Sequence, residues 1–123
     1  MFCTSIGVVS ITSENVEVIA GVIYNPILNE MVTSAKGRGC YMNGELLKTD
    51  GRQSIDDVKN NQGIALSEAV VNVGFPVYSE ATLDVSSRAV STLAKRVRGL
   101  RMIASASQVM SWVAQGKFNA YVR

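Results

Sequence analysis

The chain has 123 residues, which is long enough for one ordinary domain with a core of its own. Hydrophobic residues make up 47% of it and charged residues 18%, a balance typical of a folded protein rather than a disordered one. Twelve basic and ten acidic residues leave a net charge of +2, which by itself is too small to indicate a nucleic-acid or membrane partner, so we expect neither.

The two cysteines, Cys3 and Cys40, lie far apart, and the sequence contains no histidine. A zinc site of the usual Cys/His kind is therefore excluded. The two thiols can form a disulfide, although we favour free thiols in a reducing compartment. The apolar N-terminal segment has no basic residue before Lys36 and is interrupted by Glu14, so it predicts neither a secretory signal nor a membrane span. We expect a cytoplasmic location, or an organellar one if a targeting segment precedes this chain.

The first half of the chain is rich in β-branched residues and predicts an antiparallel meander. Turn residues separate its β-rich runs: Ser13 to Asn15 after the first run, and Asn25-Pro26 and then Leu28 to Glu30 after the second. The expected strands are residues 2–12, 16–24 and 31–35.

The stretch SAKGRGCYMNGELL, residues 34–47, allows two interpretations. Its glycines, with Lys36 and Arg38, could cradle a phosphate. However, it matches neither the P-loop nor the dinucleotide fingerprint, and no amphipathic helix follows it. Asn43-Gly44 is instead the dipeptide that suits a type I′ hairpin turn, because both residues tolerate positive φ. We therefore predict a turn between two strands.

The second half alternates helical and extended patterns. The polar segment 48–63 predicts a surface loop with one short helical turn at 54–58. Leu83, Val90, Leu93 and Val97 recur with the period of an amphipathic helix, which we expect to begin near Ser79. The other expected elements are strands at 69–74, 98–103 and 118–122, and a helix at 105–115 capped by Ser105 or Ser107 and ending at Gly116. The predicted fold is α/β: an antiparallel meander followed by α-β-α-β, a layered sandwich that is incomplete.

Few residues could carry out acid–base or metal chemistry. Asp56 and Asp57 are the only adjacent acids, and neighbouring side chains diverge on a strand or a helix, so we favour a solvated or helix-capping role for them. Serine nucleophiles have no histidine to activate them. The basic run Lys95, Arg96, Arg98 and Arg101 could bind phosphate, but it also matches the preference of a helix C-terminus for cations, which we favour.

The strand-to-helix junction RMIASASQ is the candidate binding site that these exclusions leave. Small residues at Ala104, Ser105 and Ala106 let a ligand approach the backbone closely. The free N–H groups of a helix start favour an anionic or hydroxyl-bearing ligand.

Three segments together resemble the inositol monophosphatase family of magnesium-dependent sugar-phosphate phosphatases. FCTSIGVV and EVIAGVIYNPILNEMVTSAKGRGCYMNGELL are similar to its paired strands and its K-G-x-G-A-x-x-N-G segment, with Cys40 where alanine is usual. GLRMIASASQVMSWVAQGKFNAYV is similar to its G-x-R-x-x-G-[ST]-A-A segment, the helix after it and the A-Y strand, with Ala104 where glycine is usual.

The resemblance implies a sugar-phosphatase fold in which residues 1–97 are the latter part of an N-terminal α+β domain and residues 98–123 begin a C-terminal α/β domain. It places substrate-contacting backbone at Ala104, Ser105 and Ala106. A family glutamate that contacts substrate hydroxyls aligns with Arg123. The family's magnesium ligands lie in a glutamate and a D-P-[IL]-D-G-T segment before these strands and a W-D pair after them, so the resemblance implies that this chain contains neither metal ligands nor catalytic residues.

Two functional hypotheses follow from the resemblance. In the first, the chain is an interior fragment of a Mg²⁺-dependent phosphomonoesterase that hydrolyses inositol monophosphate or a similar small polyol phosphate, is itself inactive, and belongs to a parent that is a homodimer. Histidinol phosphate, nucleotide bisphosphates and fructose bisphosphate are alternative substrates. In the second, the chain is a non-catalytic binding or regulatory module derived from that family.

Overall fold

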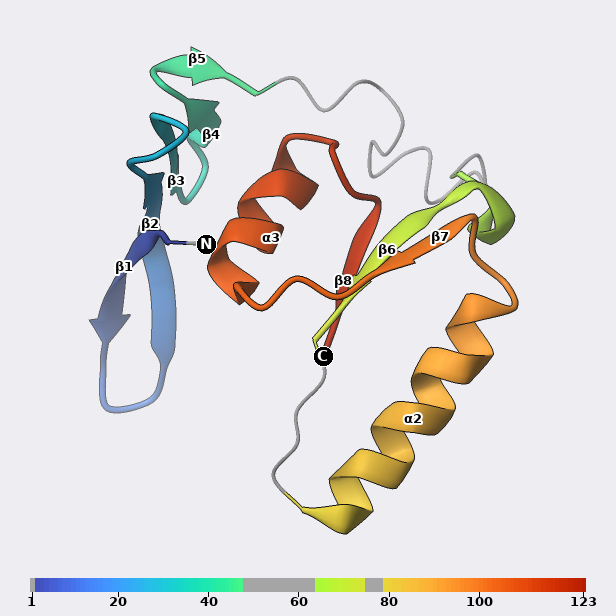
Figure 1. Cartoon of the computed structure of the whole chain (residues 1–123). Coiled ribbons are helices and arrows are strands. Elements are labelled where there is room, and N and C mark those ends of the chain that lie inside the picture. Colours follow the sequence, from blue (N-terminus) through green and yellow to red (C-terminus); the bar gives the residue numbers. More distant parts are fainter. Residues whose placement is uncertain (1, 48–63, 75–78) are drawn as a thin grey trace. The chain divides into compact units, whose positions relative to one another are not determined.

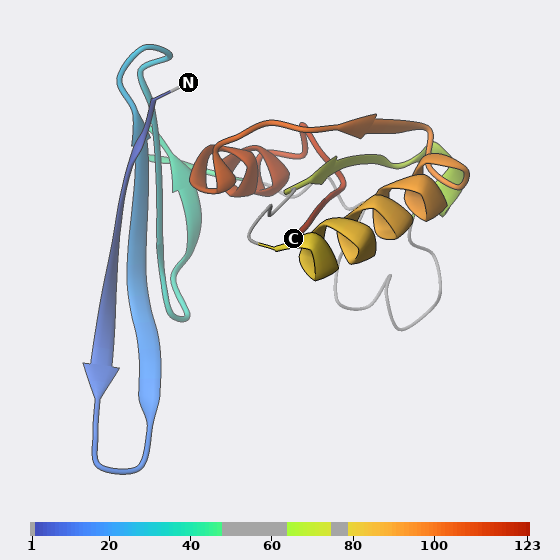
Figure 2. The same ribbon diagram turned by 60° about the horizontal axis from the view of Figure 1, so that its bottom comes forward.

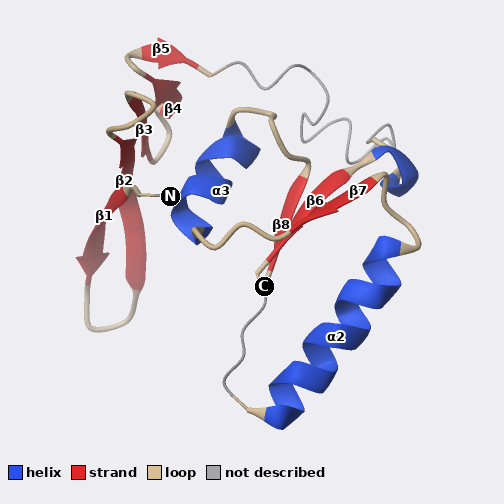
Figure 3. Cartoon of the chain, viewed as in Figure 1, coloured by secondary structure: helices blue, strands red, loops and turns tan. Residues whose placement is uncertain are grey.

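The computed structural model describes residues 2–47, 64–74 and 79–123. The chain divides into two compact units, Met1–Lys48 and Thr49–Arg123 (Figure 1). The first unit is built from strands, whereas the second combines helices and strands (Figure 3). The mixed α/β class expected from the sequence is therefore confirmed. The loop and the short helical turn predicted within 48–63 lie outside the described residues.

The first unit is an antiparallel meander, as the alternation of β-rich runs and turns predicts. Its strands pair in chain order, and β1 and β2 form a long two-stranded ribbon (Figure 2). The ribbon contains a bulge between Val8 and Val9, where the register of β1 against β2 shifts. The strands are β1 (Thr4–Ile11), β2 (Val16–Asn25), β3 (Glu30–Ala35), β4 (Gly39–Met42) and β5 (Glu45–Leu46).

The glycine-rich stretch turns the chain between strands. Asn43 and Gly44 join β4 to β5 with φ values of 50° and 87°, so both residues have the positive φ that a type I′ turn requires. The Asn43 side chain also accepts a hydrogen bond from the Met31 N–H at 2.8 Å and donates one to the Asn29 carbonyl at 2.9 Å. The predicted turn is confirmed. The side chain of Asn43 also links this turn to the hairpin formed by β2 and β3.

The second unit is built on a three-stranded parallel sheet with the order β7-β6-β8. A 3-10 helix, η1, precedes β6 and was not expected from the sequence. The elements are η1 (Leu66–Glu68), β6 (Val70–Val73), α2 (Glu80–Ala94), β7 (Gly99–Arg101), α3 (Ala106–Ala114) and β8 (Ala120–Val122). The sequence pattern did not reveal that β6 is the central strand of a second, parallel sheet, separate from the meander. Parallel pairing joins residues far apart in the chain, so local patterns do not predict it.

The core of the second unit lies between β6 and α2. Ala69, Val71 and Val73 are buried, and the apolar stripe of α2 and its C-terminal turn, Val90, Leu93 and Val97, packs against them. Helix α2 begins as expected at Ser79, whose side chain forms a capping box with Thr82. The helical period of the sequence thus predicted both the helix and its buried face.

Asn119 joins β8 to β6 at the start of the sheet. Its Oδ1 accepts a hydrogen bond from the Val70 N–H at 2.8 Å, and its own N–H donates to the Val70 carbonyl at 2.9 Å. β6 and β7 lie on either side of the boundary predicted after Val97 and yet share one sheet. That domain boundary stays a prediction.

Candidate functional site

The carboxyl edge of the parallel sheet is where the topology of the second unit favours a ligand. The chain leaves β6 toward α2 on one side and leaves β7 toward α3, before it returns to β8 on the other side of β6. Because such crossovers are right-handed, the two helices cover opposite faces of the sheet, as they do in Figure 1. The connections after β6 and β7 therefore diverge, and a crevice at such a divergence is the usual ligand position of an open α/β sheet.

The start of α3 lies at this edge. Ser105 is its N-cap, and its Oγ accepts a hydrogen bond from the Gln108 N–H at 3.4 Å, while its carbonyl accepts one from the Val109 N–H at 3.0 Å. The N-cap is therefore Ser105, one of the two residues, Ser105 or Ser107, that the sequence predicted for this role. Ala106 is the first helical residue, a position whose N–H has no partner within its own helix.

Ala104, Ser105 and Ala106 are contiguous in this connection, with Ala104 exposed and the other two half-buried. One of the donors expected there is already used, because Ser105 caps Gln108. The N–H of Ala106, the first helical residue, is a donor that an incoming anion could use. Whether these residues bind substrate stays a prediction.

Gly74 and Tyr121 form a close contact at the same edge that the sequence analysis missed. A Cβ atom placed on Gly74 would lie 2.7 Å from the Tyr121 hydroxyl and 3.3 Å from Cγ of Arg123. Any side chain at position 74 would therefore displace the tyrosine. A glycine directly after a strand is a signal for close approach, and it could have indicated this contact. Arg123 lies beside the same glycine, at the carboxyl end of β8.

Asn72 is a second feature that sequence reasoning did not single out. It lies on the central strand β6 and is completely buried. Neither its Nδ2 nor its Oδ1 has a hydrogen-bond partner among the residues that the structure describes. A buried carboxamide is costly without partners, so this residue marks the α3 side of the sheet as a place where a polar group or a water molecule would be stabilising.

The described residues do not fit a magnesium site. Within residues 2–47, 64–74 and 79–123, no three His, Cys, Asp or Glu side chains come together in a way that could hold a metal ion. Asp56 and Asp57 lie outside the described residues.

Other residues weighed from the sequence lie away from this edge or have structural roles. Trp112 on α3 contacts the ring of Phe118, with centroids 6.1 Å apart, and the Lys117 ammonium lies 5.9 Å from the Trp112 centroid. No disulfide joins Cys3 and Cys40 among the described residues, so the disulfide alternative is wrong for this structure. Neither α2 nor α3, the helices of the described residues, has the length and apolar character needed to cross a membrane.

Comparison with known proteins matches the inositol monophosphatase family over residues 1–123. The chain belongs to this family. Inositol monophosphatase 1 from Solanum lycopersicum is similar to it, with 29% identity over 97% of this chain. The alignment covers 38% of the tomato protein, so this chain spans well under half of that relative's length.

Solved structures of the inositol monophosphatase family show the same fold. The inositol monophosphatase from Anabaena (Nostoc) sp. PCC 7120 superposes with a TM-score of 0.75 and 26% identity, over 100% of this chain and 43% of that one. An IMPase/NADP phosphatase complexed with Mg²⁺ and phosphate superposes with a TM-score of 0.59 over 83% of this chain and 32% of that one. Its 15% identity makes it a likeness of fold alone. The sugar-phosphatase fold expected from the sequence is confirmed.

Proposed function

We propose that this chain is the substrate-positioning part of a phosphomonoesterase that acts on inositol monophosphate or a similar small polyol phosphate. The observation that carries the proposal is the family match over residues 1–123, joined to a helix start at the diverging carboxyl edge of a parallel sheet. In this proposal, the backbone of Ala104, Ser105 and Ala106 holds the anionic or hydroxyl-bearing part of the substrate. Magnesium belongs to the proposed full-length enzyme, and its ligands come from outside the described residues.

Two features of the site support a positioning role. The N-terminus of α3 carries a partial positive charge, and the Ala106 N–H points along the helix toward an incoming anion. The small side chains of Ala104 and Ala106 leave the backbone accessible. Positioning lowers the barrier of a phosphoryl transfer only when other groups supply the nucleophile and stabilise the developing charge. We therefore expect the isolated chain to bind phosphate compounds weakly and to hydrolyse none.

The binding half of the proposal can be tested with Ala106→Pro. Proline fits the first position of a helix, and Ser105 is extended, with φ −119° and ψ 99°, so it is already outside the α region that a residue before proline avoids. The substitution removes one N–H and leaves the helix intact. Chemical-shift titration with inorganic phosphate and with inositol monophosphate should show binding to the wild-type chain and at least a threefold weaker affinity in the variant.

The matched control is Glu80→Pro, which places proline at the same position of α2, after the extended cap Ser79. This variant should bind the phosphate compounds as the wild type does. Equal weakening in both variants, or no change in Ala106→Pro, would show that the start of α3 is not the binding site.

The catalytic half is tested by a phosphate-release assay with inositol monophosphate and Mg²⁺. We expect no release above buffer from the purified chain. Magnesium-dependent turnover that persists through re-purification would contradict the positioning role. Mass measurement of the native protein separates a part of a larger homodimeric enzyme from the alternative, a short non-catalytic module. We expect a larger species, and the cytoplasmic location stays a prediction.

A further inference from the structure

The charges of this chain are strongly segregated, although the net charge is only +2. Every acidic residue lies at or before Asp84, so residues 85–123 contain no carboxylate side chain. The same segment contains seven of the twelve basic residues: Arg88, Lys95, Arg96, Arg98, Arg101, Lys117 and Arg123. A net charge near zero had argued against a polyanionic partner, but a partner contacts a local surface and responds to the local charge.

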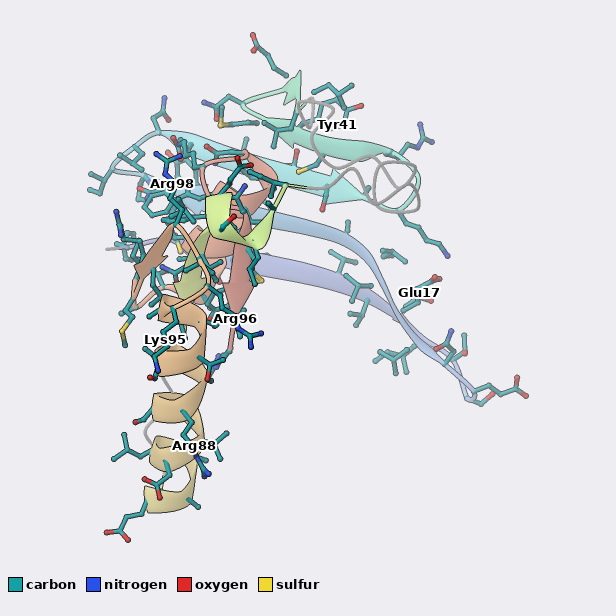
Figure 4. The ribbon with its side chains drawn as sticks, turned by 90° about the vertical axis from the view of Figure 1, so that its right-hand side faces the viewer. Glu17, Tyr41, Arg88, Lys95, Arg96 and Arg98 are labelled. Carbon is teal, nitrogen blue, oxygen red and sulfur yellow. The ribbon has the colours of Figure 1, made fainter. Side chains whose placement is uncertain are left out.

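Four of these cations lie on α2 or in the connection between α2 and β7. Arg88, Lys95, Arg96 and Arg98 are all exposed, and Figure 4 shows them spread from the middle of α2 to its C-terminal connection. We call these four residues the α2 basic surface. No salt bridge involves them among the described residues, and the Arg88 Nε instead donates to the Asp84 carbonyl at 3.4 Å. Among the described residues these four cations therefore form no ion pair, although the Asp84 carboxylate lies one turn before Arg88.

The helix dipole explains only part of this arrangement. It stabilises cations close to the C-terminal end of a helix, where Lys95 is the C-cap of α2 and Arg96 follows it directly. Arg88 lies two turns earlier, and Arg98 comes after the helix has ended. Seven residues separate Arg88 from Lys95, so the two share one outward stripe with a rise of about 10 Å between them. The stripe lies opposite Val90 and Leu93, which pack on the sheet.

The residues between the cations indicate the kind of partner. Ser91 and Thr92 are exposed on the same stripe and offer hydroxyl donors. Hydroxyls beside arginine and lysine are the groups that proteins use to contact phosphate oxygens of nucleic acids. Between Arg88 and Arg98 the stripe has no large apolar side chain to insert into a bilayer, although Val85, 62% exposed, lies one turn before Arg88, and it has no aromatic anchor of the kind found in protein–protein hot spots.

We propose that the α2 basic surface binds the phosphate backbone of a nucleic-acid strand, independently of its base sequence. Asp84 bounds the surface on the N-terminal side of Arg88 and limits its affinity, because its carboxylate repels phosphate. The proposal is separate from the phosphatase assignment, because it uses the outward face of α2 and none of the residues at the start of α3.

The test is fluorescence anisotropy of a labelled single-stranded 20-nucleotide oligothymidylate, titrated with the whole chain at several salt concentrations. Four phosphate contacts on a single strand predict a log–log salt slope of about −2.8. The double variant Lys95→Gln/Arg96→Gln should reduce the slope to about −1.4 and, with the affinity extrapolated to 1 M salt unchanged, weaken binding about 25-fold at 0.1 M salt. Asp84→Asn should strengthen binding.

Two controls separate this surface from general charge and from the start of α3. Lys36→Gln/Arg38→Gln makes the same change in net charge within the first unit and should leave oligonucleotide affinity unchanged. Ala106→Pro should also leave it unchanged. Absence of salt-dependent binding by the wild type, or equal weakening by the control pair, would overturn the proposal. Tighter binding to phosphatidylserine vesicles or to polyglutamate than to the oligonucleotide would overturn it as well, in favour of a membrane or an acidic protein.

Discussion

Single side chains hold the parallel sheet together where its strands are short. Asn119 does so through its Oδ1, which accepts the hydrogen bond of the partly buried Val70 N–H at 2.8 Å. Asn119→Ala should lower the free energy of unfolding by about 1–2 kcal/mol, because it leaves that N–H without an acceptor. Denaturant unfolding of the chain measures the change. Asn119→Asp retains an acceptor oxygen and should lose less, so an equal loss in both variants would show that the hydrogen bond is not the cause.

Cys40 has a thiol whose pKa is shifted by its surroundings. Burial raises the pKa of its thiol above the ordinary 9.0, and a hydrogen bond from the Tyr41 backbone only partly opposes this. A raised thiol pKa means that burial of this group contributes stability below pH 9, and that this contribution is lost as pH rises through the folded pKa. In a Cys3→Ser variant, the pH profile of iodoacetamide alkylation should have its midpoint above 9.0 in the folded chain. A midpoint at or below that of the denatured chain would contradict the burial.

At the scale of elements, the β4–β5 hairpin depends on Asn43 in two ways. The residue adopts a φ of 50° and bonds the Met31 N–H and the Asn29 carbonyl through its side chain. Asn43→Gly retains the backbone conformation and loses the side-chain bonds, whereas Asn43→Ala loses both. We expect the alanine variant to be about 1 kcal/mol less stable than the glycine variant. In both, the Met31 amide should exchange its hydrogen faster, and unchanged protection would show that the side-chain bond does not stabilise the hairpin.

Local sequence patterns predict where helices, strands and turns occur, but they do not predict the length of every strand. Strands β1 to β3, the Asn43-Gly44 turn, the Ser79 cap and the Ser105 cap all follow from residues within a few positions of one another. The strand predicted over 98–103 is shorter, Gly99–Arg101, because β7 pairs only where Val70 to Asn72 of β6 lie opposite it. The length of a strand depends on its partner, and the partner lies elsewhere in the sequence.

At the scale of the whole molecule, the first unit has little core of its own. Val32 is the one apolar residue among 2–47 that is buried, whereas Ile6 is 59% exposed and Val8 is 48% exposed. Ile6 pairs with Val22 and Val8 with Ala20, so these apolar side chains lie on one face of the ribbon. Exposed apolar faces and edge strands promote association. We expect the isolated chain to associate as its concentration rises in sedimentation velocity.

A matched pair of substitutions tests the cause of that association. Ile6→Thr removes apolar surface from the sheet face, and Ile27→Thr makes the same change at a residue that is 81% exposed in the β2–β3 turn. Association should decrease in the first variant and persist in the second. A chain that stays monomeric at every concentration would show that the exposed face is well tolerated.

The sequence by itself determined the local structure and the family: hydrophobic period, turn dipeptides and caps depend on near neighbours, and the motif order along the chain resembles one family. It also located the Ala104–Ala106 connection, because small residues at the start of a helix are a local signal. Only the tertiary structure decided that β6 is the centre of a separate parallel sheet, that Tyr121 lies against Gly74, and that Asn72 is buried without a partner among the described residues. These features join residues tens of positions apart, and such pairings depend on packing and crossover handedness, which no short stretch of sequence contains.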